Sequence, residues 1–494
     1  MNPLKKLFKQ TAIYGLATVI PRLLNVILVP VYTSAMKPEF YGELSVIFSW
    51  IAILNVLLAY GMETAFFRFF SKADKKETVI STSLISILVS SILFVGLGFL
   101  FQNSLATLLN IDPKYITYVL CILGLDAMVI IPFAWLRANE KPTRYSVIKI
   151  LNVVINLSLT IFFLMALPKM VSTNSQSFFA GLYLPDFQIS YILIANLVAS
   201  GITLLLMVSL YRKSTYTFDI ALWKTMLKYA SPVLVAGVAY TINEVFGRIM
   251  LEDMLTDIFD AEYAKSEVGK YAACIKLALF MNLFATAFRM GVEPFFFSHS
   301  DSENPQKAYA QITNYFVILG SVIMLSVVVF ADILKMIFIP NPEYWEAMNV
   351  VPLILLASFF LGIYHNLSVW YKVSDKTRFG AFISIIGAVL TIAINYVFIP
   401  KIGYLASAIA TLSAYGTMMF LSYYFGRSRY PVPYNFRKIL FYMGISILFS
   451  VIAFYGFDRS LFAGIPLLLI FLGVVYKLEN DKLKRIFVKK KADI

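Results

Sequence analysis

Apolar residues recur in long runs along the whole chain, separated by short polar stretches that hold most of the charges. Each run reaches about 20 residues, the length that a helix needs to cross the hydrocarbon core of a bilayer. The pattern predicts fourteen membrane-spanning helices over residues 11–33, 41–65, 79–101, 114–136, 146–167, 188–211, 226–251, 268–292, 311–338, 347–371, 379–399, 404–425, 437–456 and 459–476. An even number of spans places both ends of the chain on one side of the membrane.

Composition supports an integral membrane protein. Of the 494 residues, 60% are hydrophobic and only 14% are charged, whereas about 25% of the residues in a soluble domain are charged. The opening MNPLKKLFKQ resembles the start of a signal peptide, but the apolar run after it is too long and has no small-residue cleavage site, so we expect an uncleaved first span. The predicted fold class is an all-α integral membrane protein.

The distribution of Lys and Arg predicts the orientation. With these spans, 30 of the 42 basic residues lie on the side of the N-terminus and 8 lie in the opposite loops. Positive residues concentrate in cytoplasmic loops, so both termini are expected in the cytoplasm. The net charge of +14 is then explained by this bias and by attraction to anionic membrane lipids, without a nucleic-acid partner.

Two pairs of segments resemble each other. FYGELSV at 40–46 is similar to VGKYAAC at 268–274, and YGMETAFFRFF at 60–70 is similar to RMGVEPFFF at 289–297. The pairs stand six spans apart and therefore run in the same direction, which suggests two parallel six-helix lobes around a central cavity, a known transporter plan. The expected division is an N-terminal lobe at 1–211, a C-terminal lobe at 212–425, two extra helices at 426–476 and a basic cytoplasmic tail at 477–494.

Few charges fall inside the spans. A charge at the centre of a bilayer costs about 2.5–3.5 kcal/mol on insertion scales, so such side chains should face water or each other. The residues that we single out on this ground are Arg22, Glu63, Asp126, Glu244, Arg248 and Lys276. Pro21 and Pro30 flank Arg22 and are expected to loosen the first span there.

These charges allow more than one interpretation. Glu244 and Arg248 are four residues apart on one helix face, so they either neutralise each other or Arg248 lines a cavity and Glu244 steadies it. Arg22 has no acid within a helical turn and needs a partner on another helix or an anionic ligand. Lys276 is similar, although it could also snorkel to the outer surface. Asp126 is either a counter-charge or a site for a coupling proton.

The sequence carries no recognisable catalytic centre. It has no G-x-x-x-x-G-K-[ST] loop, no nucleophile with a neighbouring base and no acid pair in an external loop, and its external loops, the longest at 168–187 and 252–267, cannot hold a folded domain. Cys121, Cys274, His299 and His365 show no metal-ligand spacing. We predict a non-enzymatic protein without a cofactor or metal, and a proton or sodium as a coupling ion is left open.

The segment from Thr11 to Phe70 resembles the start of Wzx-type polysaccharide (O-antigen) flippases, members of the multidrug/oligosaccharidyl-lipid/polysaccharide exporter superfamily. The features that carry the resemblance are the Pro-Arg of the first span, the PEFYGELS turn and the aromatic end of the second span. The resemblance implies alternating-access transport of a polyprenyl-pyrophosphate-linked oligosaccharide from the inner to the outer leaflet of the bacterial cytoplasmic membrane. It also makes a polysaccharide polymerase a candidate partner.

In similar flippases, cationic residues on spans 1, 2, 7 and 8 meet the pyrophosphate. The resemblance therefore assigns substrate binding to Arg22, Arg248 and Lys276, while span 2 departs from the pattern because its nearest cation, Arg68, lies at the inner mouth. Glu63, Asp126 and Glu244 are expected to support the site or to couple an ion.

Three alternative functions remain. A lipid II flippase of peptidoglycan synthesis would share the mechanics with a different headgroup. A multidrug exporter of the same fold is less favoured, because drug cations need acidic cavities and the central charges here lean positive. A membrane glycosyltransferase or polymerase would need a sizeable external loop with catalytic residues, which the spans do not leave.

Overall fold

The chain is helical throughout its regular structure. The computed structural model describes residues 3–174, 178–298, 304–374 and 376–492, with side chains from Val19 to Asn480 except those of 175–178, 213, 293–294, 297–303 and 375. Within these residues, thirteen segments are long and apolar enough to cross a membrane, and Val19–Ala35 is a shorter apolar helix. Together they confirm the predicted all-α membrane fold with its fourteen spans.

The chain divides into two compact units, which we describe separately. The first unit comprises Met1–Lys276, Phe338–Ala347 and Thr377–Ala414. Its helices, with part of α19, are α1 (Pro3–Ala35), α2 (Pro38–Ala59), α3 (Met62–Lys72), α4 (Lys76–Leu100), α5 (Gln102–Leu109), α6 (Pro113–Met128), α7 (Ile130–Ala138), α8 (Pro142–Ile161), α9 (Leu167–Thr173), α10 (Gln188–Lys213), α11 (Ile220–Ile258), α12 (Ala261–Cys274), α18 (Arg378–Ile402) and α19 (Tyr404–Arg429).

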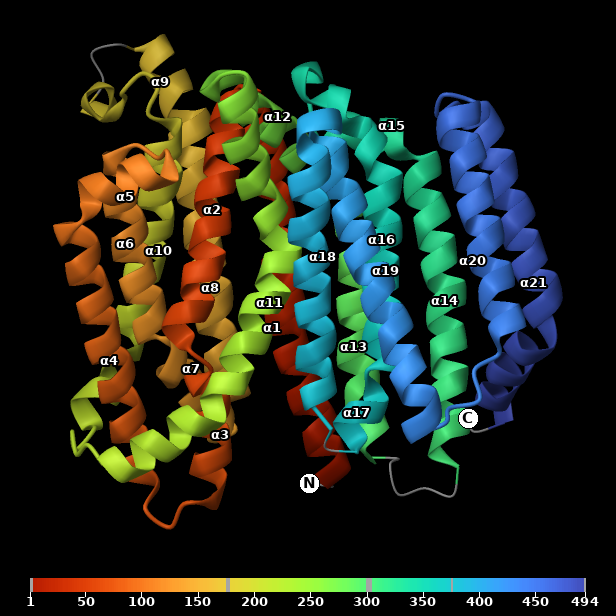
Figure 1. Ribbon diagram of the computed structural model, residues 1–494, viewed down its shortest axis with the longest axis horizontal. Coiled ribbons are helices and arrows are strands. Elements are labelled where there is room, and N and C mark those ends of the chain that lie inside the picture. Colours follow the sequence, from red (N-terminus) through yellow and green to blue (C-terminus); the bar gives the residue numbers. More distant parts are fainter. Residues whose placement is uncertain (1–2, 175–177, 299–303, 375, 493–494) are drawn as a thin grey trace. The chain divides into compact units, whose positions relative to one another are not determined.

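Two packing centres organise the first unit (Figure 1). In one, α10 packs against α6 and α8, and α1 packs on the same α8. In the other, the long helix α11 packs against α18 and α2, while α12 packs on α2. The start of α11 is fixed by Asp219, whose Oδ1 accepts hydrogen bonds from the amides of Ala221 and Leu222 at 2.9 Å each. The same α2 therefore contacts the two helices that carry Arg248 and precede Lys276.

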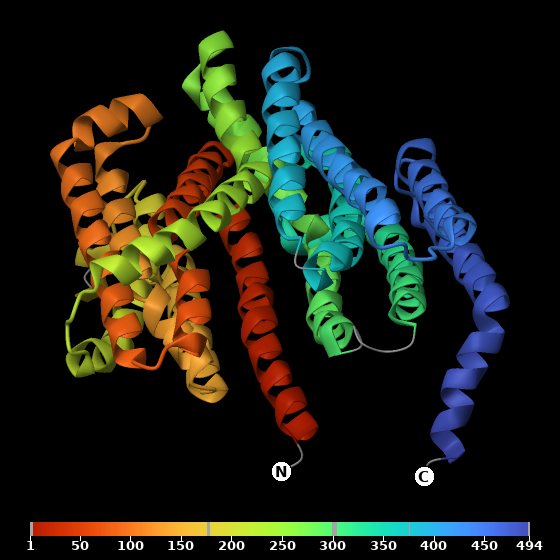
Figure 2. The ribbon, with the colours of Figure 1, turned by 60° about the horizontal axis from the view of Figure 1, so that its bottom comes forward.

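The second unit comprises Leu277–Ile337, Met348–Lys376 and Tyr415–Ile494. A core of buried residues from α14, α20, the π-turn η5 and α21, among them Leu325, Tyr442 and Phe471, holds the last two spans in place. Figures 1 and 2 both show α20 and α21 side by side. The helices of this unit, with the rest of α19, are α13 (Leu279–Ser298), α14 (Pro305–Val329), α15 (Ala331–Phe338), α16 (Val351–Leu367), α17 (Val369–Val373), α20 (Phe436–Val451), η5 (Ile452–Gly456) and α21 (Leu461–Ala492).

The structure differs from the sequence-based expectations at three places. The predicted loop 252–267 is a helical hairpin, because α11 continues to Ile258 and Asp260 caps α12 by accepting from the amide of Tyr263 at 2.8 Å. The described parts of loop 168–187 contain α9 and the 3₁₀ turn η2 (Phe178–Leu182). The helix α1 continues through both of its prolines without interruption (Figure 2), since neighbouring helices can compensate for the backbone bonds that proline removes in a membrane.

Candidate functional site

Arg248 lies on α11 and points to α2. Its Nη1 donates a hydrogen bond to Oγ of Ser45 at 3.2 Å, and its side chain is half-buried. The buried side chains of Tyr41 and Tyr271 lie close enough to interact electrostatically with the guanidinium of Arg248. A guanidinium has five donors in a planar fork, and the bond to Ser45 orients this fork.

A buried polar network holds the segment of α11 around Arg248 against α18 and α19. Thr391 donates to Oδ1 of Asn243 at 3.0 Å, and Nδ2 of Asn243 donates to the carbonyl of Ser384 at 3.2 Å. Ser407 donates to Oδ1 of Asn395 at 2.7 Å and contacts the carbonyl of Gly247 at 3.3 Å. Because buried polar networks are rigid when their members are paired, the backbone that carries Arg248 has a fixed position.

Lys276 lies where the eighth span is interrupted. The helix α12 ends at Cys274 and the 3₁₀ turn η3 (Ile275–Ala278) follows, before α13 begins at Leu279. Short 3₁₀ stretches within a helix often mark hinges, and here the division between the two units falls directly after Lys276. The charges of Arg248 and Glu244 both act on the ammonium of Lys276. Three of the predicted site residues therefore lie together.

The other predicted residues have separate surroundings. Glu244 is exposed and takes part in no ion pair among the described residues, so the hydrogen bond that orients Arg248 comes from Ser45 rather than from an ion pair with Glu244. Arg22 is exposed on α1, the helix that packs against α8. Glu63 on α3 forms an ion pair with Arg137 on α7. The roles of these residues in transport stay predictions.

The Glu63–Arg137 ion pair connects α3 to α7 in the first unit. The guanidinium of Arg137 also lies over the ring of Phe67 at 4.8 Å and that of Tyr145 at 5.8 Å. Arg137→Ala is therefore expected to lower the free energy of unfolding by about 1–3 kcal/mol. Thermal unfolding in detergent would measure the loss. Arg212→Ala, which removes an exposed cation from α10, is the control; equal melting temperatures of the two variants would show that the pair contributes nothing.

Asp126 lines a polar cavity of ≈ 380 Å³ inside the first unit. Its Oδ1 accepts from Oγ of Ser200 at 2.7 Å, and Lys149 lines the same cavity and acts on its charge. Asn55, Asn152 and Asn196 complete the polar wall. The structure thus gives Asp126 a nearby cation. Lys149 is one of the 30 basic residues that the sequence assigned to the side of the N-terminus, and its position near the start of α8 gave no sign that its side chain lines a cavity.

The ends of α2 and α12 that are predicted to face outside cross at two glycines. A Cβ atom on Gly42 would lie 1.8 Å from the carbonyl oxygen of Lys265, and one on Gly269 would lie 1.9 Å from that of Pro38. The ion pair between Lys265 and Glu43, at 3.3 Å, ties the same two helices. These are the first glycines of the two similar segments, so the repeat in the sequence marks a contact in the fold.

Within the described residues, no group of three or more His, Cys, Asp or Glu side chains could hold a metal ion. The candidate site presents the cationic side chains of Arg248 and Lys276. Arg248 and Lys276 can donate to phosphate oxygens, and Ser45, which sequence reasoning missed, fixes the Arg. A serine within an apolar span gives no signal of its own, and only the packing of α2 on α11 reveals its role.

Comparisons with known proteins agree with this fold. A family model described as "Polysaccharide biosynthesis protein" matches residues 7–292, and a second, "MatE", matches residues 249–397. No curated protein sequence matches the chain.

Three solved structures illustrate the similarity. The lipid II flippase MurJ in an inward closed conformation is 15% identical, with a TM-score of 0.73 over 94% of this chain and 98% of that one. A multidrug resistance MATE transporter of the MOP superfamily is similar in its inward-facing form, at 14% identity and a TM-score of 0.64 over 83% and 94% of the two chains. An outward-facing MATE transporter of the MOP superfamily is 14% identical, with a TM-score of 0.57 over 87% of this chain and 96% of that one.

The first family match extends over more than half of the chain, and the similar solved structures share its fold. The protein is a multi-pass membrane protein that belongs to the polysaccharide biosynthesis protein family and has the fold of the flippases and exporters of the MOP superfamily.

Proposed function

We propose that the protein moves polyprenyl-pyrophosphate-linked oligosaccharide from the inner to the outer leaflet of the bacterial cytoplasmic membrane, by alternating access, for surface polysaccharide biosynthesis. The observation that carries the proposal is the pair of membrane-embedded cations Arg248 and Lys276, in a chain of the polysaccharide biosynthesis family. Arg22 on α1 would join them in binding the pyrophosphate. Both termini would lie in the cytoplasm.

The physical problem that such a protein solves is the transfer of a hydrated headgroup. The hydroxyls of a sugar lose their water partners in hydrocarbon, which is costly without replacement hydrogen bonds. A polar passage open to the lipid would remove that barrier while the polyprenyl tail stays in the membrane. The guanidinium fork of Arg248 suits the oxygens of a pyrophosphate, whereas cationic drugs would be repelled by Arg248 and Lys276.

A reconstituted translocation assay tests the proposal. Proteoliposomes would receive a labelled polyprenyl-pyrophosphate glycan, lipid II or a cationic dye in separate experiments, with protein-free liposomes as the control. We expect transport of the glycan lipid and none of the dye. Lipid II is the second candidate substrate, since the fold is shared with a lipid II flippase; transport of lipid II alone, or of the dye alone, would reject the proposal in favour of that alternative.

Membrane voltage is expected to drive the cycle. An inside-negative potential favours outward movement of an anion by about 2.3 kcal/mol per charge per 100 mV, and it favours the return of an empty cationic site. Imposing such a potential on the proteoliposomes with a potassium gradient and valinomycin should accelerate outward transport, and reversing the potential should slow it. Rates that do not respond to either potential would rule out this form of coupling.

The carboxylates have separate proposed roles. Asp126, in a cavity with Lys149, is the proposed site for a coupling ion. Glu63 supports the fold through Arg137, and Glu244 supports the cation pair from the exposed face of α11.

A further inference from the structure

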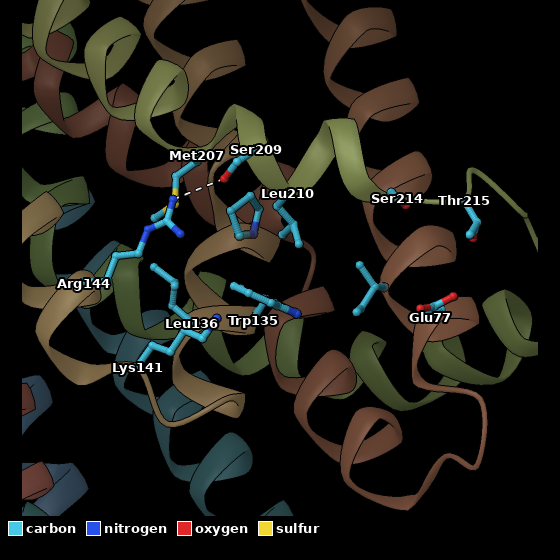
Figure 3. Close-up of a pocket in the computed structure, with 12 residues that line it drawn as sticks. Glu77, Trp135, Leu136, Lys141, Arg144, Met207, Ser209, Leu210, Ser214 and Thr215 are labelled. Atoms are coloured by element: carbon cyan, nitrogen blue, oxygen red, sulfur yellow. Dashed lines mark hydrogen bonds between the residues drawn. The ribbon is translucent and has the colours of Figure 1, made fainter.

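A second open cavity lies in the first unit, where the ends of α4, α7, α8 and α10 meet (Figure 3). Its volume is ≈ 260 Å³, below the range of about 300–1,000 Å³ that is usual for drug-sized ligands. Apolar side chains, including Ile80, Trp135 and Leu210, form much of the wall. The positive-inside prediction puts these helix ends at the inner membrane surface, where Trp side chains commonly lie at headgroup level.

One end of this cavity is cationic. Nη2 of Arg144 donates to the carbonyl of Leu206 at 3.1 Å and to Oγ of Ser209 at 3.2 Å, which fixes the guanidinium beside the cavity. Lys141 lies next to it, with Nζ 4.4 Å from the centre of the Trp135 ring. Neither cation forms an ion pair with a carboxylate of the described residues, so both can receive an anionic group.

The opposite end is acidic and polar. Figure 3 shows Glu77 across the cavity from Arg144 and Lys141, with Trp135 and Leu210 between them. Glu77 lies in the first turn of α4, where the helix dipole favours a carboxylate, and it has no ion pair to another described residue. The hydroxyl of Ser214, which lines the same cavity, is buried and has no hydrogen-bond partner among the residues that the structure describes. At this end of the cavity, the carboxylate of Glu77 can accept a hydrogen bond from a ligand.

We propose that this cavity binds the headgroup of a zwitterionic phospholipid that carries a primary ammonium group. The phosphate would lie at Arg144 and Lys141, and the ammonium would donate to the carboxylate of Glu77. The two ends carry the two opposite charges of such a headgroup, and apolar side chains lie between them. The site is separate from Arg248 and Lys276, so it does not depend on the proposed transport function.

Native mass spectrometry of the full-length protein in detergent tests the proposal. The probes are phosphatidylethanolamine, phosphatidylcholine and phosphatidylglycerol with identical acyl chains. Phosphatidylethanolamine should bind about tenfold more tightly than either of the others, because it alone offers ammonium N–H donors to the carboxylate. Equal binding of the three lipids, or a preference for phosphatidylglycerol, would overturn the proposal.

Two variants separate the ends of the cavity. Glu77→Gln should lower the affinity for phosphatidylethanolamine about tenfold and leave the affinity for phosphatidylglycerol unchanged. Arg144→Gln should lower the affinity for all three lipids. Asp74→Asn and Lys72→Gln change exposed charges near the start of α4 and are the matched controls. Unchanged phosphatidylethanolamine preference in Glu77→Gln would overturn the proposal; if a variant does not fold, the comparison of headgroups on the unmodified chain decides.

Discussion

Arg248→Ala is expected to give a folded, membrane-inserted protein that exports no surface polysaccharide. The substitution removes a half-buried cation whose position is set by Ser45, and with it the fork that would bind the pyrophosphate. Loss of one partner from a buried, hydrogen-bonded charge pair costs about 2–5 kcal/mol, which corresponds to roughly 30-fold or more in binding. Surface polysaccharide in cells that lack the native protein, measured beside the amount of inserted variant, reports the loss.

The same export measurement, made on a second variant, should distinguish the contribution of the guanidinium fork from that of the positive charge alone. Arg248→Lys keeps the charge without the fork and is expected to retain partial export, and Arg22→Ala should resemble Arg248→Ala. Lys37→Ala removes an exposed cation at the start of α2 and serves as the control. Normal polysaccharide from Arg248→Ala at normal protein levels would remove Arg248 from the site.

Gly42→Ala is expected to block transport by separating α2 from α12. The added Cβ would lie 1.8 Å from a backbone oxygen, whereas non-bonded heavy atoms pack at about 3.5–4.0 Å. A side-chain rotamer cannot relieve this overlap, so the helix ends must move apart. Overpacking of this kind costs about 1–3 kcal/mol, which disfavours the closed crossing by roughly 5- to 150-fold. Gly269→Ala should act in the same way.

The natural cysteine Cys274 can be used to detect the separation of α2 from α12 by chemical labelling. It is fully buried and its thiol donates to the carbonyl of Tyr344 at 3.3 Å, close to the crossing. In a Cys121→Ser background, a membrane-impermeant maleimide added from outside should leave Cys274 unlabelled and should label it in Gly42→Ala. Gly96→Ala is the matched control, because a Cβ at Gly96 meets no atom within 4 Å. Equal labelling of all three proteins would show that the crossing does not close the outer end.

The membrane fold and part of the site could be predicted from the sequence for clear physical reasons. Spans follow from the length of apolar runs, since the bilayer fixes that length. Arg248 and Lys276 stood out because a charge in a span is costly. The repeated glycines at Gly42 and Gly269 were visible as a pattern, and their close approach explains it.

Other features depend on contacts between helices that are distant in sequence. The i, i+4 spacing left the role of Glu244 open, and it gave no sign that the neighbouring α2 places Ser45 against the guanidinium of Arg248. Lys149 near the start of α8 was indistinguishable from a loop cation, and only packing shows that it shares a cavity with Asp126. The segment 252–267 was expected to be a loop because it lies between two predicted spans, yet the cap at Asp260 makes it a helical hairpin.

The central claim is that Arg248 and Lys276 receive the pyrophosphate of a lipid-linked glycan. The most direct measurement is the affinity of the purified protein for two synthetic lipids that share one glycan and one polyprenyl chain, joined either by pyrophosphate or by an uncharged ether. We predict at least about tenfold tighter binding of the pyrophosphate lipid, and loss of this preference in Arg248→Ala/Lys276→Ala. Equal affinity for the two lipids, or a preference that survives both substitutions, would contradict the claim.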